Sequence, residues 1–247
     1  MSPTLSPDRL GEGLLRAQLH WQTRRPAEAA ASSSATAGPA AFTIAISREA
    51  GAQGGAIAAE LGVRLGWPVY DRELLRHIAE EMGLSDRLLE SVDEKRASWL
   101  MTYLQAFASN NAVSKGAYLY HLSKAVLSLA AHGECILVGR GVAQFLPPAK
   151  SLRVRLVAPR GDRIAVMQKR TGLSFDEAAR RVDAIDTNRA NFVCDHFHKD
   201  VADPTLYDLI LNTSRFDVEE GAVLIEQALR RFQARQPSET EKPALVD

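Results

Sequence analysis

The sequence predicts an α/β fold in which helices cover a five-stranded parallel sheet. Short apolar segments at 42–46, 67–70, 135–138, 152–157 and 207–212 alternate with stretches of helical periodicity. Strands that alternate with helices favour parallel pairing, because each crossover helix returns the chain to the same edge of the sheet. The segment 135–138 is apolar throughout, which is typical of a strand buried on both faces.

The first strand leads into a glycine-rich turn. β-Forming residues alternate along 42–46, and Gly51, Gly54 and Gly55 follow just before a helix with a regular apolar face. Glycine permits positive φ and close approach of the backbone to a ligand. A helix N-terminus adds unpaired N–H groups and the positive end of the helix dipole. The turn is therefore a candidate phosphate-binding loop, with an ordinary strand-to-helix turn as the alternative.

The next two helices have recognisable start and stop signals. Gly66 ends the first helix, and Asp71 stands at the carboxyl end of the second strand. Asp71 either caps the helix that starts at Arg72 or points into a site at this edge of the sheet. Gly83 is expected to end that helix, and Ser85 to cap the next one.

The third strand ends in Gly139-Arg140-Gly141. A guanidinium at the end of a parallel strand matches phosphate oxygens in a bidentate manner, so Arg140 is a candidate phosphate ligand. The alternative is a surface arginine in a tight turn. Two helices are expected before this strand, within 96–132. Another two are expected after the fourth strand: one over 161–171, and one opened by the Ser174–Glu177 capping-box pattern.

These last two helices are rich in arginine. Arg163, Arg170 and Arg189 lie on them, and Asp186 stands three residues before Arg189, so that it orients this arginine or forms a simple surface ion pair with it. Together with the glycine turn and Arg140, they give the layout expected of phosphoryl transfer between nucleotides. That reaction depends on positioning and on neutralising phosphate charge, with Mg²⁺ bridging the oxygens.

The amino-acid composition limits the classes of partner that the protein can be expected to bind. The chain has 247 residues, 30 basic and 30 acidic, so its formal net charge of +0 gives no bulk electrostatic case for binding nucleic acid or an acidic membrane. Two cysteines suit a reducing compartment, and we expect a cytoplasmic protein. No apolar run approaches the ~18 residues of a membrane span, and no secretory signal pattern precedes the domain. The sequence does not indicate an oligomeric state.

The chain divides into three regions. Residues 1–41 are expected to form an extension with a short amphipathic helix and a flexible linker rich in Ala, Ser and Pro. Residues 42–235 form the α/β domain. Residues 236–247 are polar and contain proline, so we expect a disordered tail.

From about residue 42 to 229 the chain resembles the cytidylate kinase-like family, a branch of the P-loop nucleoside monophosphate kinases. The order and spacing of several segments carry the resemblance, namely 46–51 (ISREAG), 54–55 (GG), 69–75 (VYDRELL), 138–141 (VGRG), 186–192 (DTNRANF) and 207–213 (YDLILNT). The resemblance implies a three-layer α/β/α P-loop kinase fold with a helical lid.

The resemblance also implies roles for the matching residues. ATP with Mg²⁺ would be the phosphoryl donor, and a CMP- or dCMP-like nucleotide the acceptor. The donor phosphates would meet Gly51, Gly54 and Gly55. Asp71 and Arg140 match the acceptor side. The lid arginines, supported by Asp186, would gather around the transferred group; they are Arg163, Arg170 and Arg189.

Two departures from the family pattern leave a second function open. Phosphate-binding loops of this kind carry Lys and Ser/Thr where Gly54, Gly55 and Ala56 stand here. Arg48 either replaces the missing charge or is structural. The acceptor-side carboxylate after Arg140 is also replaced, by Gly141. The alternative function is therefore a nucleotide-binding regulatory protein on a kinase fold. We expect no metal-binding set of protein side chains, although the residue types of 194–198 (CDHFH) suit zinc.

Overall fold

The computed structural model describes residues 42–80, 82–90, 92, 100–105, 117–139 and 141–235. Within these ranges the chain forms one five-stranded sheet in the order β2-β3-β1-β4-β5. Every neighbouring pair is parallel, as predicted. The strands are β1 (Thr43–Arg48), β2 (Val69–Tyr70), β3 (Cys135–Val138), β4 (Ser151–Val157) and β5 (Leu209–Asn212).

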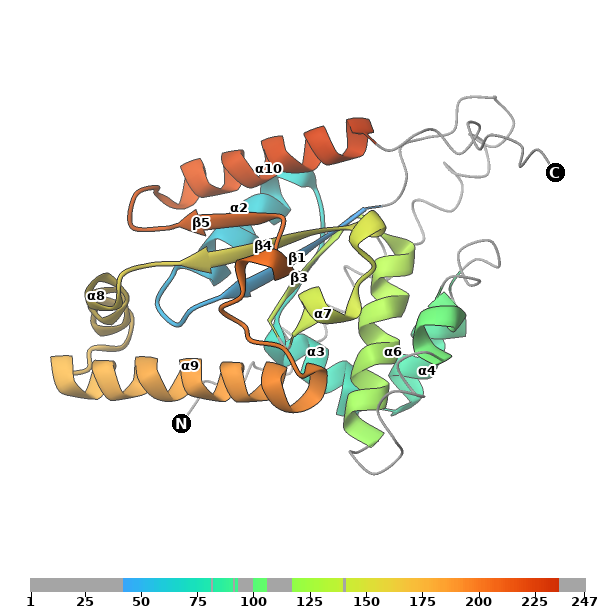
Figure 1. Ribbon diagram of the computed structural model, residues 1–247, viewed down its shortest axis with the longest axis horizontal. Helices are drawn as coiled ribbons and strands as arrows, with labels where there is room; N and C mark the ends of the chain where they lie inside the picture. The colour runs from blue at the N-terminus through green and yellow to red at the C-terminus, as the bar shows by residue number, and fades with distance from the viewer. Residues whose placement is uncertain are drawn as a thin grey trace.

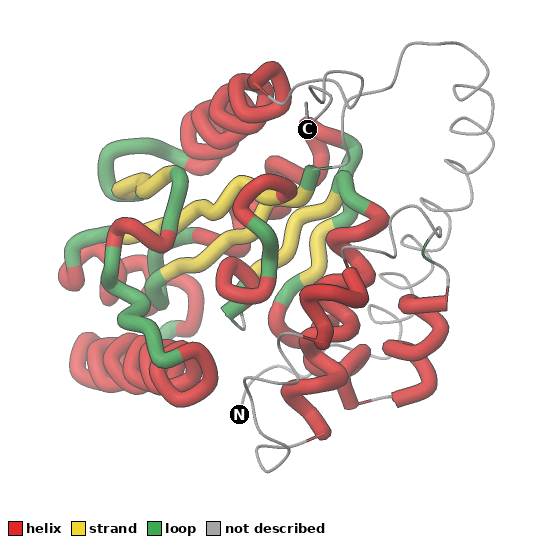
Figure 2. The backbone as a smooth tube through the Cα atoms, turned by 45° about the vertical axis from the view of Figure 1, so that its right-hand side comes forward, coloured by secondary structure: helices red, strands yellow, loops and turns green. Residues whose placement is uncertain are grey.

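Helices cover both faces of the sheet and confirm the three-layer α/β/α architecture (Figure 1). The helices are α2 (Gly54–Leu65), α3 (Arg72–Glu80), α4 (Met82–Glu90), α6 (Ala117–His132), α7 (Val142–Phe145), α8 (Arg160–Thr171), α9 (Phe175–Phe197) and α10 (Val218–Arg235), with 3₁₀ turns η1 (Pro148–Lys150) and η2 (Pro204–Leu206). Figure 2 shows α2 and α10 on one side of the yellow strands, with α3, α4 and α6 grouped on the other.

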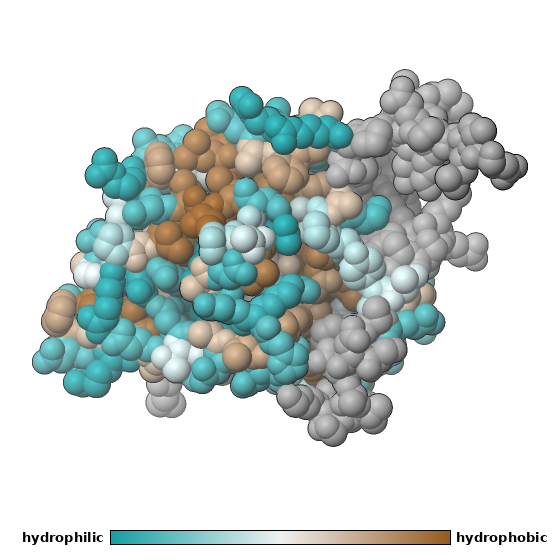
Figure 3. All heavy atoms as spheres, viewed as in Figure 1, coloured by the Kyte–Doolittle hydropathy of each residue, from teal (hydrophilic) through white to brown (hydrophobic). Residues whose placement is uncertain are grey.

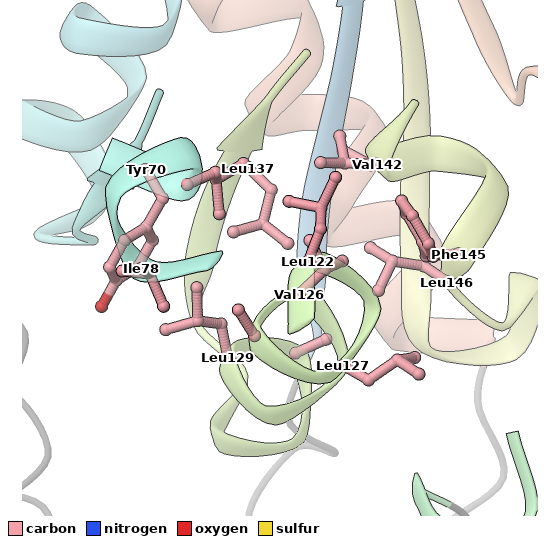
Figure 4. Close-up of a cluster of buried hydrophobic side chains, with 14 of the residues drawn as sticks. Tyr70, Ile78, Leu122, Val126, Leu127, Leu129, Leu137, Val142, Phe145 and Leu146 are labelled. Atoms are coloured by element: carbon pink, nitrogen blue, oxygen red, sulfur yellow. The ribbon is translucent and has the colours of Figure 1, made fainter. Parts of the chain in front are cut away.

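The alternation of side chains along the strands builds two separate cores. Ile44 and Ile46 of β1 belong to the cluster beneath α2 and α10. Ala45, between them, belongs to the cluster formed with α3, α4 and α6. Successive residues of a strand point to opposite faces, so one apolar strand supplies both cores. In Figure 4 side chains of α6, including Leu122, lie beneath Leu137 of β3.

One helix boundary differs from its prediction. Gly83 and Ser85 were expected to separate two helices, but α3 already ends at Glu80 and α4 begins at Met82. Ser85 is buried inside α4, where its Oγ is 2.9 Å from Nδ1 of His121 on α6. A tertiary hydrogen bond therefore uses the hydroxyl that was expected to cap the helix.

Helices α8 and α9 form a pair with a small core of its own. Ser174 and Glu177 make the predicted capping box at the start of α9. Ile164 and Met167 of α8 pack against Val182 of α9. Ala50, from the glycine-rich turn, is buried in this same cluster. The pair is thus the helical lid, and its core includes a residue of the turn below it.

The surface carries few large apolar side chains over the lid. In Figure 3 hydrophilic residues dominate along α8 and α9, whereas hydrophobic residues gather over β5 and α10. Ile210 of β5 and Phe216 just after it are among the exposed apolar residues. Within the described residues, no helix is long and apolar enough to cross a membrane. The predicted extension 1–41 and tail 236–247 lie outside the described residues.

The two cysteines should differ sharply in reactivity. Burial raises the pKa of the Cys135 thiol to about 12, whereas Cys194 is exposed on α9. Because the thiolate is the reactive form, a disulfide reagent at neutral pH should label Cys194 quickly and Cys135 only after denaturation. Titration of the native protein should therefore count one thiol and of the unfolded protein two. Rapid labelling of a Cys194→Ser variant in its native state would contradict this.

Candidate functional site

The glycine-rich turn joins β1 to α2 through residues 49–53 in an unusual backbone conformation. Gly51 has φ +84°, and Gln53, which precedes α2, has φ +51°. No side chain caps α2, and its first turn contains no acidic residue. A Cβ added at Gly55 would meet nothing within 4 Å. The start of α2 therefore has neither a side-chain cap nor a carboxylate to compete with a bound anion, which suits an anion site.

Gly51 is required by its surroundings as well as by its φ. A Cβ at this position would lie 2.3 Å from the main-chain oxygen of Arg163. Gly51→Ala should therefore destabilise the protein by about 2–4 kcal/mol, because strain in φ and a backbone clash add together. Gly55→Ala is the matched control and should leave stability unchanged or raise it slightly. Urea denaturation of both variants measures the difference; equal midpoints would contradict the prediction.

Arg163 and Asp186 fasten the turn to the lid. The Arg163 guanidinium is buried, donates to the Ala158 oxygen (2.9 Å) and the Ala50 oxygen (3.2 Å), and pairs with Asp186. The Ala50 N–H donates to Asp186 Oδ1 at 2.7 Å. Glu49 Oε2 lies 3.3 Å from Arg163 Nε and accepts the Ala158 N–H at 3.1 Å. The turn is thus held by charged side chains from both lid helices.

A cavity of about 420 Å³ lies beside the turn, at the carboxyl ends of β1 and β3 and below α9. The negative charges in its lining are the carboxylates of Glu49 and Asp186, and Asn188 adds a polar side chain. Its described lining also includes several arginines, namely Arg48, Arg72, Arg155 and Arg189. We call this space the arginine cavity. Guanidinium groups that converge on one space favour an anionic ligand with several oxygens.

Burial and neighbouring charges act on Arg189 in this cavity. Its Nη1 donates to the Arg48 main-chain oxygen at 2.8 Å and lies 3.8 Å from Asp186 Oδ1. Burial lowers the pKa of the Arg189 guanidinium to about 10; Asp186 acts in the opposite direction. Further lowering of this pKa comes from the neighbouring positive charges of Arg72, Arg170 and Arg155. The protein therefore concentrates positive charge here at an electrostatic cost, which a bound anion would offset.

Arg155 and Arg72 were not predicted from the sequence. Arg155 lies within β4 and is 7% exposed. Its Nη1 donates to Ser47 Oγ at 3.2 Å, and its guanidinium lies 5.5 Å from the Tyr207 ring centroid. The signal was an arginine at an alternating position of β4, a position that Arg153 two residues earlier shares. Arg72 begins α3 directly after Asp71, where it was taken only as the start of a helix.

A second hollow, of about 400 Å³, lies on the other side of the turn. Gly51 and Gln53 form one wall, α8 contributes Asp162 and Val166, and the segment 213–217 after β5 closes it. We call it the outer hollow. The glycine-rich turn thus separates two spaces: Gly51 borders the outer hollow, and Arg48 borders the arginine cavity.

A scan against family models matches residues 43–215 to the cytidylate kinase-like family. The chain belongs to this family. It is 25% identical over 170 residues to a cytidylate kinase of Methanopyrus kandleri. The aligned region covers 63% of this chain and 85% of that protein. A cytidylate kinase of Thermoplasma volcanium is 24% identical over 185 residues, 74% of this chain and 88% of that protein.

A solved structure with the same fold is that of an uncharacterized protein from Eubacterium ventriosum. It is 18% identical, with a TM-score of 0.62, and covers 77% of this chain and 98% of that one. Family and architecture together make the domain a P-loop kinase fold with a helical lid, as the resemblance implied.

Within this kinase-like domain the predicted residues occupy different places. Arg48, Asp186 and Arg189 meet in the arginine cavity. Gly51 borders the outer hollow. Gly54 and Gly55 open α2. Arg140 lies outside the described residues, although the flanking Gly139 and Gly141 line the arginine cavity.

Three predicted residues are not brought into either space. Arg163 lies beneath the turn, as described above. Arg170 is exposed on α8 and donates to Met167 Sδ at 3.4 Å. Asp71 Oδ1 accepts the N–H groups of Glu73 and Leu74, both at 2.9 Å, so it caps α3. The predicted roles of Arg163, Arg170 and Asp71 in substrate binding stay predictions.

The described residues do not build a protein metal site. No group of three or more His, Cys, Asp and Glu side chains is arranged to hold an ion in the described part of the chain. This holds also for the 194–198 segment, whose residue types suit zinc. Ser47 Oγ, on β1 just before the turn, lies within hydrogen-bonding distance of Arg155 and Tyr207.

Proposed function

We propose that this protein is a nucleoside monophosphate kinase that transfers a phosphoryl group from ATP to a CMP- or dCMP-like acceptor. The observation that carries the proposal is the position of the glycine-rich turn between two spaces. The outer hollow borders the open start of α2, and the arginine cavity lies across the turn. Two nucleotides bound on the two sides would place their phosphates near the same turn, which is the arrangement that in-line transfer requires.

The donor fits the outer hollow. Gly51 and the start of α2 offer backbone N–H groups to its phosphates. Phe216, which is 37% exposed, offers an aromatic face to its base. Mg²⁺ enters this proposal as part of the nucleotide substrate, because the described side chains form no site for it. When bound, it would neutralise phosphate charge.

The acceptor fits the arginine cavity. Arg72, Arg155 and Arg189 would meet its phosphate, and Arg140 is the predicted partner from the end of β3. Arg163 serves the reaction indirectly, since it holds the turn through Ala50 and Asp186. Lid helices that already contact the turn would exclude water from the transferred group, which prevents hydrolysis of the donor.

The assignment of sides can be tested at Phe216. Phe216→Ala should raise KM for ATP about tenfold and leave KM for the acceptor unchanged, because stacking on an aromatic ring contributes about 1–3 kcal/mol per base. Steady-state kinetics with each substrate varied in turn measure this. Phe175→Ala, which removes another exposed phenylalanine on the lid, is the control. A change in the acceptor KM alone would reverse the assignment.

The proposed activity is tested with the purified full-length protein. ATP, Mg²⁺ and each nucleoside or deoxynucleoside monophosphate are mixed, and formation of ADP and of the acceptor diphosphate is followed by ³¹P NMR. CMP or dCMP should give the fastest production of both. If ADP does not form above background with any acceptor, the kinase proposal is wrong.

One observation favours a second function, nucleotide binding without transfer. The Ala50 N–H of the turn donates to Asp186, so a protein carboxylate occupies a donor that could otherwise meet a phosphate. Position 54 also lacks the usual lysine. Thermal stabilisation by ATP in a protein that forms no ADP would support this regulatory function over the kinase.

A further inference from the structure

We propose that Arg48 is the phosphate-binding cation of the glycine-rich turn and takes the place of the lysine that such loops carry at the position of Gly54. The inference rests on the proposed donor site. It assigns the charge to a residue at the end of β1 instead of one on α2, and it explains why position 54 is a glycine.

The first observation is the packing of Arg48 against Gly54. A Cβ at Gly54 would lie 2.8 Å from Arg48 Cγ and 2.9 Å from Arg48 Cβ. The stem of Arg48 thus runs through the space in which a side chain at position 54 would begin. A lysine at position 54 and an arginine at position 48 compete for this space, so the chain can place a cation from only one of them.

The second observation is the end of the same side chain. A Cβ at Gly139 would lie 1.9 Å from Arg48 Nη1, and Gly139 itself has φ +87°. The guanidinium therefore lies against the backbone where β3 ends. One arginine explains two glycines that are far apart in the sequence. It extends from the start of α2 to the wall of the arginine cavity, into which the terminal phosphate of a donor bound across the turn would have to point.

The third observation is how Arg48 is held. It is the last residue of β1 and pairs with Leu156 of β4 in the sheet. Its main-chain oxygen accepts a hydrogen bond from Arg189 at 2.8 Å. The side chain therefore starts from a fixed backbone point. An arginine side chain that starts from a fixed point suits phosphate, because a guanidinium matches two phosphate oxygens in a bidentate manner.

The first experiment measures binding of ATP and of inorganic tripolyphosphate to full-length variants by calorimetry. Arg48→Ala should weaken binding of both about 10- to 100-fold, since it removes a charge-assisted contact to phosphate. Tripolyphosphate has no base, so a weaker affinity of Arg48→Ala for tripolyphosphate shows that the lost contact is to phosphate. Arg180→Ala, an exposed arginine on α9, is the control and should bind as the wild type does.

The second experiment moves the cation. The double variant Arg48→Ala with Gly54→Lys should regain at least about tenfold in tripolyphosphate affinity over Arg48→Ala. Gly54→Lys alone should bind no more tightly than the wild type, because Arg48 already occupies the space. The inference is overturned if Arg48→Ala binds both ligands as the wild type does. It is equally overturned if the double variant gains nothing over the single one.

A third variant, Gly139→Ala, keeps Arg48 and displaces its guanidinium. Gly139→Ala pushes against the Arg48 guanidinium, whereas Gly66→Ala has a similar positive φ of +67° and meets nothing within 4 Å. Tripolyphosphate binding should fall in Gly139→Ala and not in Gly66→Ala, which covers the case in which Arg48→Ala does not fold. Equal binding by these two would overturn the inference. All of these are binding measurements, so a wild type that binds ATP but transfers nothing would end the kinase proposal and leave this inference standing.

Discussion

Replacing Asp186 by alanine should destabilise the protein by about 3–5 kcal/mol, the largest effect we expect from a single substitution. Asp186 pairs with the buried Arg163 guanidinium and accepts the Ala50 N–H at 2.7 Å. Without it, Glu49 is the remaining carboxylate beside the buried Arg163 guanidinium, and the turn loses the hydrogen bond from the Ala50 N–H. Nucleotide binding should fall as well, because the turn is no longer held in its conformation.

Asp183→Ala is the matched control for this prediction. Asp183 lies on the same helix and also pairs with an arginine, Arg160, but both side chains are 52% exposed. Exposed pairs contribute little, because water and salt screen them. The two substitutions change helix propensity equally, so the difference in urea midpoint isolates the buried contacts. If Asp183→Ala loses as much stability as Asp186→Ala, the contacts of Asp186 with Arg163 and Ala50 do not stabilise the protein by the expected amount.

The architecture could be predicted because its signals are local. Alternation along β1 and helical periodicity in the stretches between strands each appear within a short stretch of sequence. The Ser174–Glu177 capping box was also a local signal. The boundary between α3 and α4 was missed, since Ser85 bonds to His121 on another helix and sequence alone does not show that partner.

The site was predicted less completely, because its contacts join residues far apart in the chain. Asp186 and Arg189 were chosen for their charge and spacing on one helix, and both lie in the arginine cavity. Arg163 was chosen in the same way, but its partners come from residues 49–50, 158 and 186, which bury it beneath the turn. A helical pattern gives the positions of charges along the chain and does not give the segment that will cover them.

Arg155 was missed for a related reason. The strand β4 carries two arginines, Arg153 and Arg155, and the sequence does not show which of them points to a cavity. Here Glu49 and Ser47 from the neighbouring strand end, together with the ring of Tyr207, keep the second of these inside at 7% exposure. The outer hollow could not be predicted either, because its walls come from the turn, α8 and the loop after β5.

The substitution Arg189→Met should separate function from stability. The lowered pKa of Arg189, about 10, shows that burial and the surrounding arginines oppose its charge in the folded protein. Methionine has a similar length and no charge, so the variant should be at least as stable as the wild type although it loses the hydrogen bond to the Arg48 oxygen. The rate of transfer should fall about 10²- to 10³-fold, because a preorganised cation beside the acceptor phosphate is lost.

The pH dependence of the stability difference between Arg189→Met and the wild type follows from the downward shift of the Arg189 pKa. The folded-state pKa of Arg189 lies below the unfolded-state value, so as the pH rises the folded protein releases this proton first. The cost of holding the charge is therefore present in full at neutral pH and diminishes only above about pH 10. Denaturation of the variant and the wild type between about pH 6 and pH 9 should give a constant difference in unfolding free energy. Arg180→Met, exposed on the same helix, should change neither stability nor rate. A marked loss of stability in Arg189→Met, with transfer retained, would show that Arg189 holds the fold together and does not bind the acceptor.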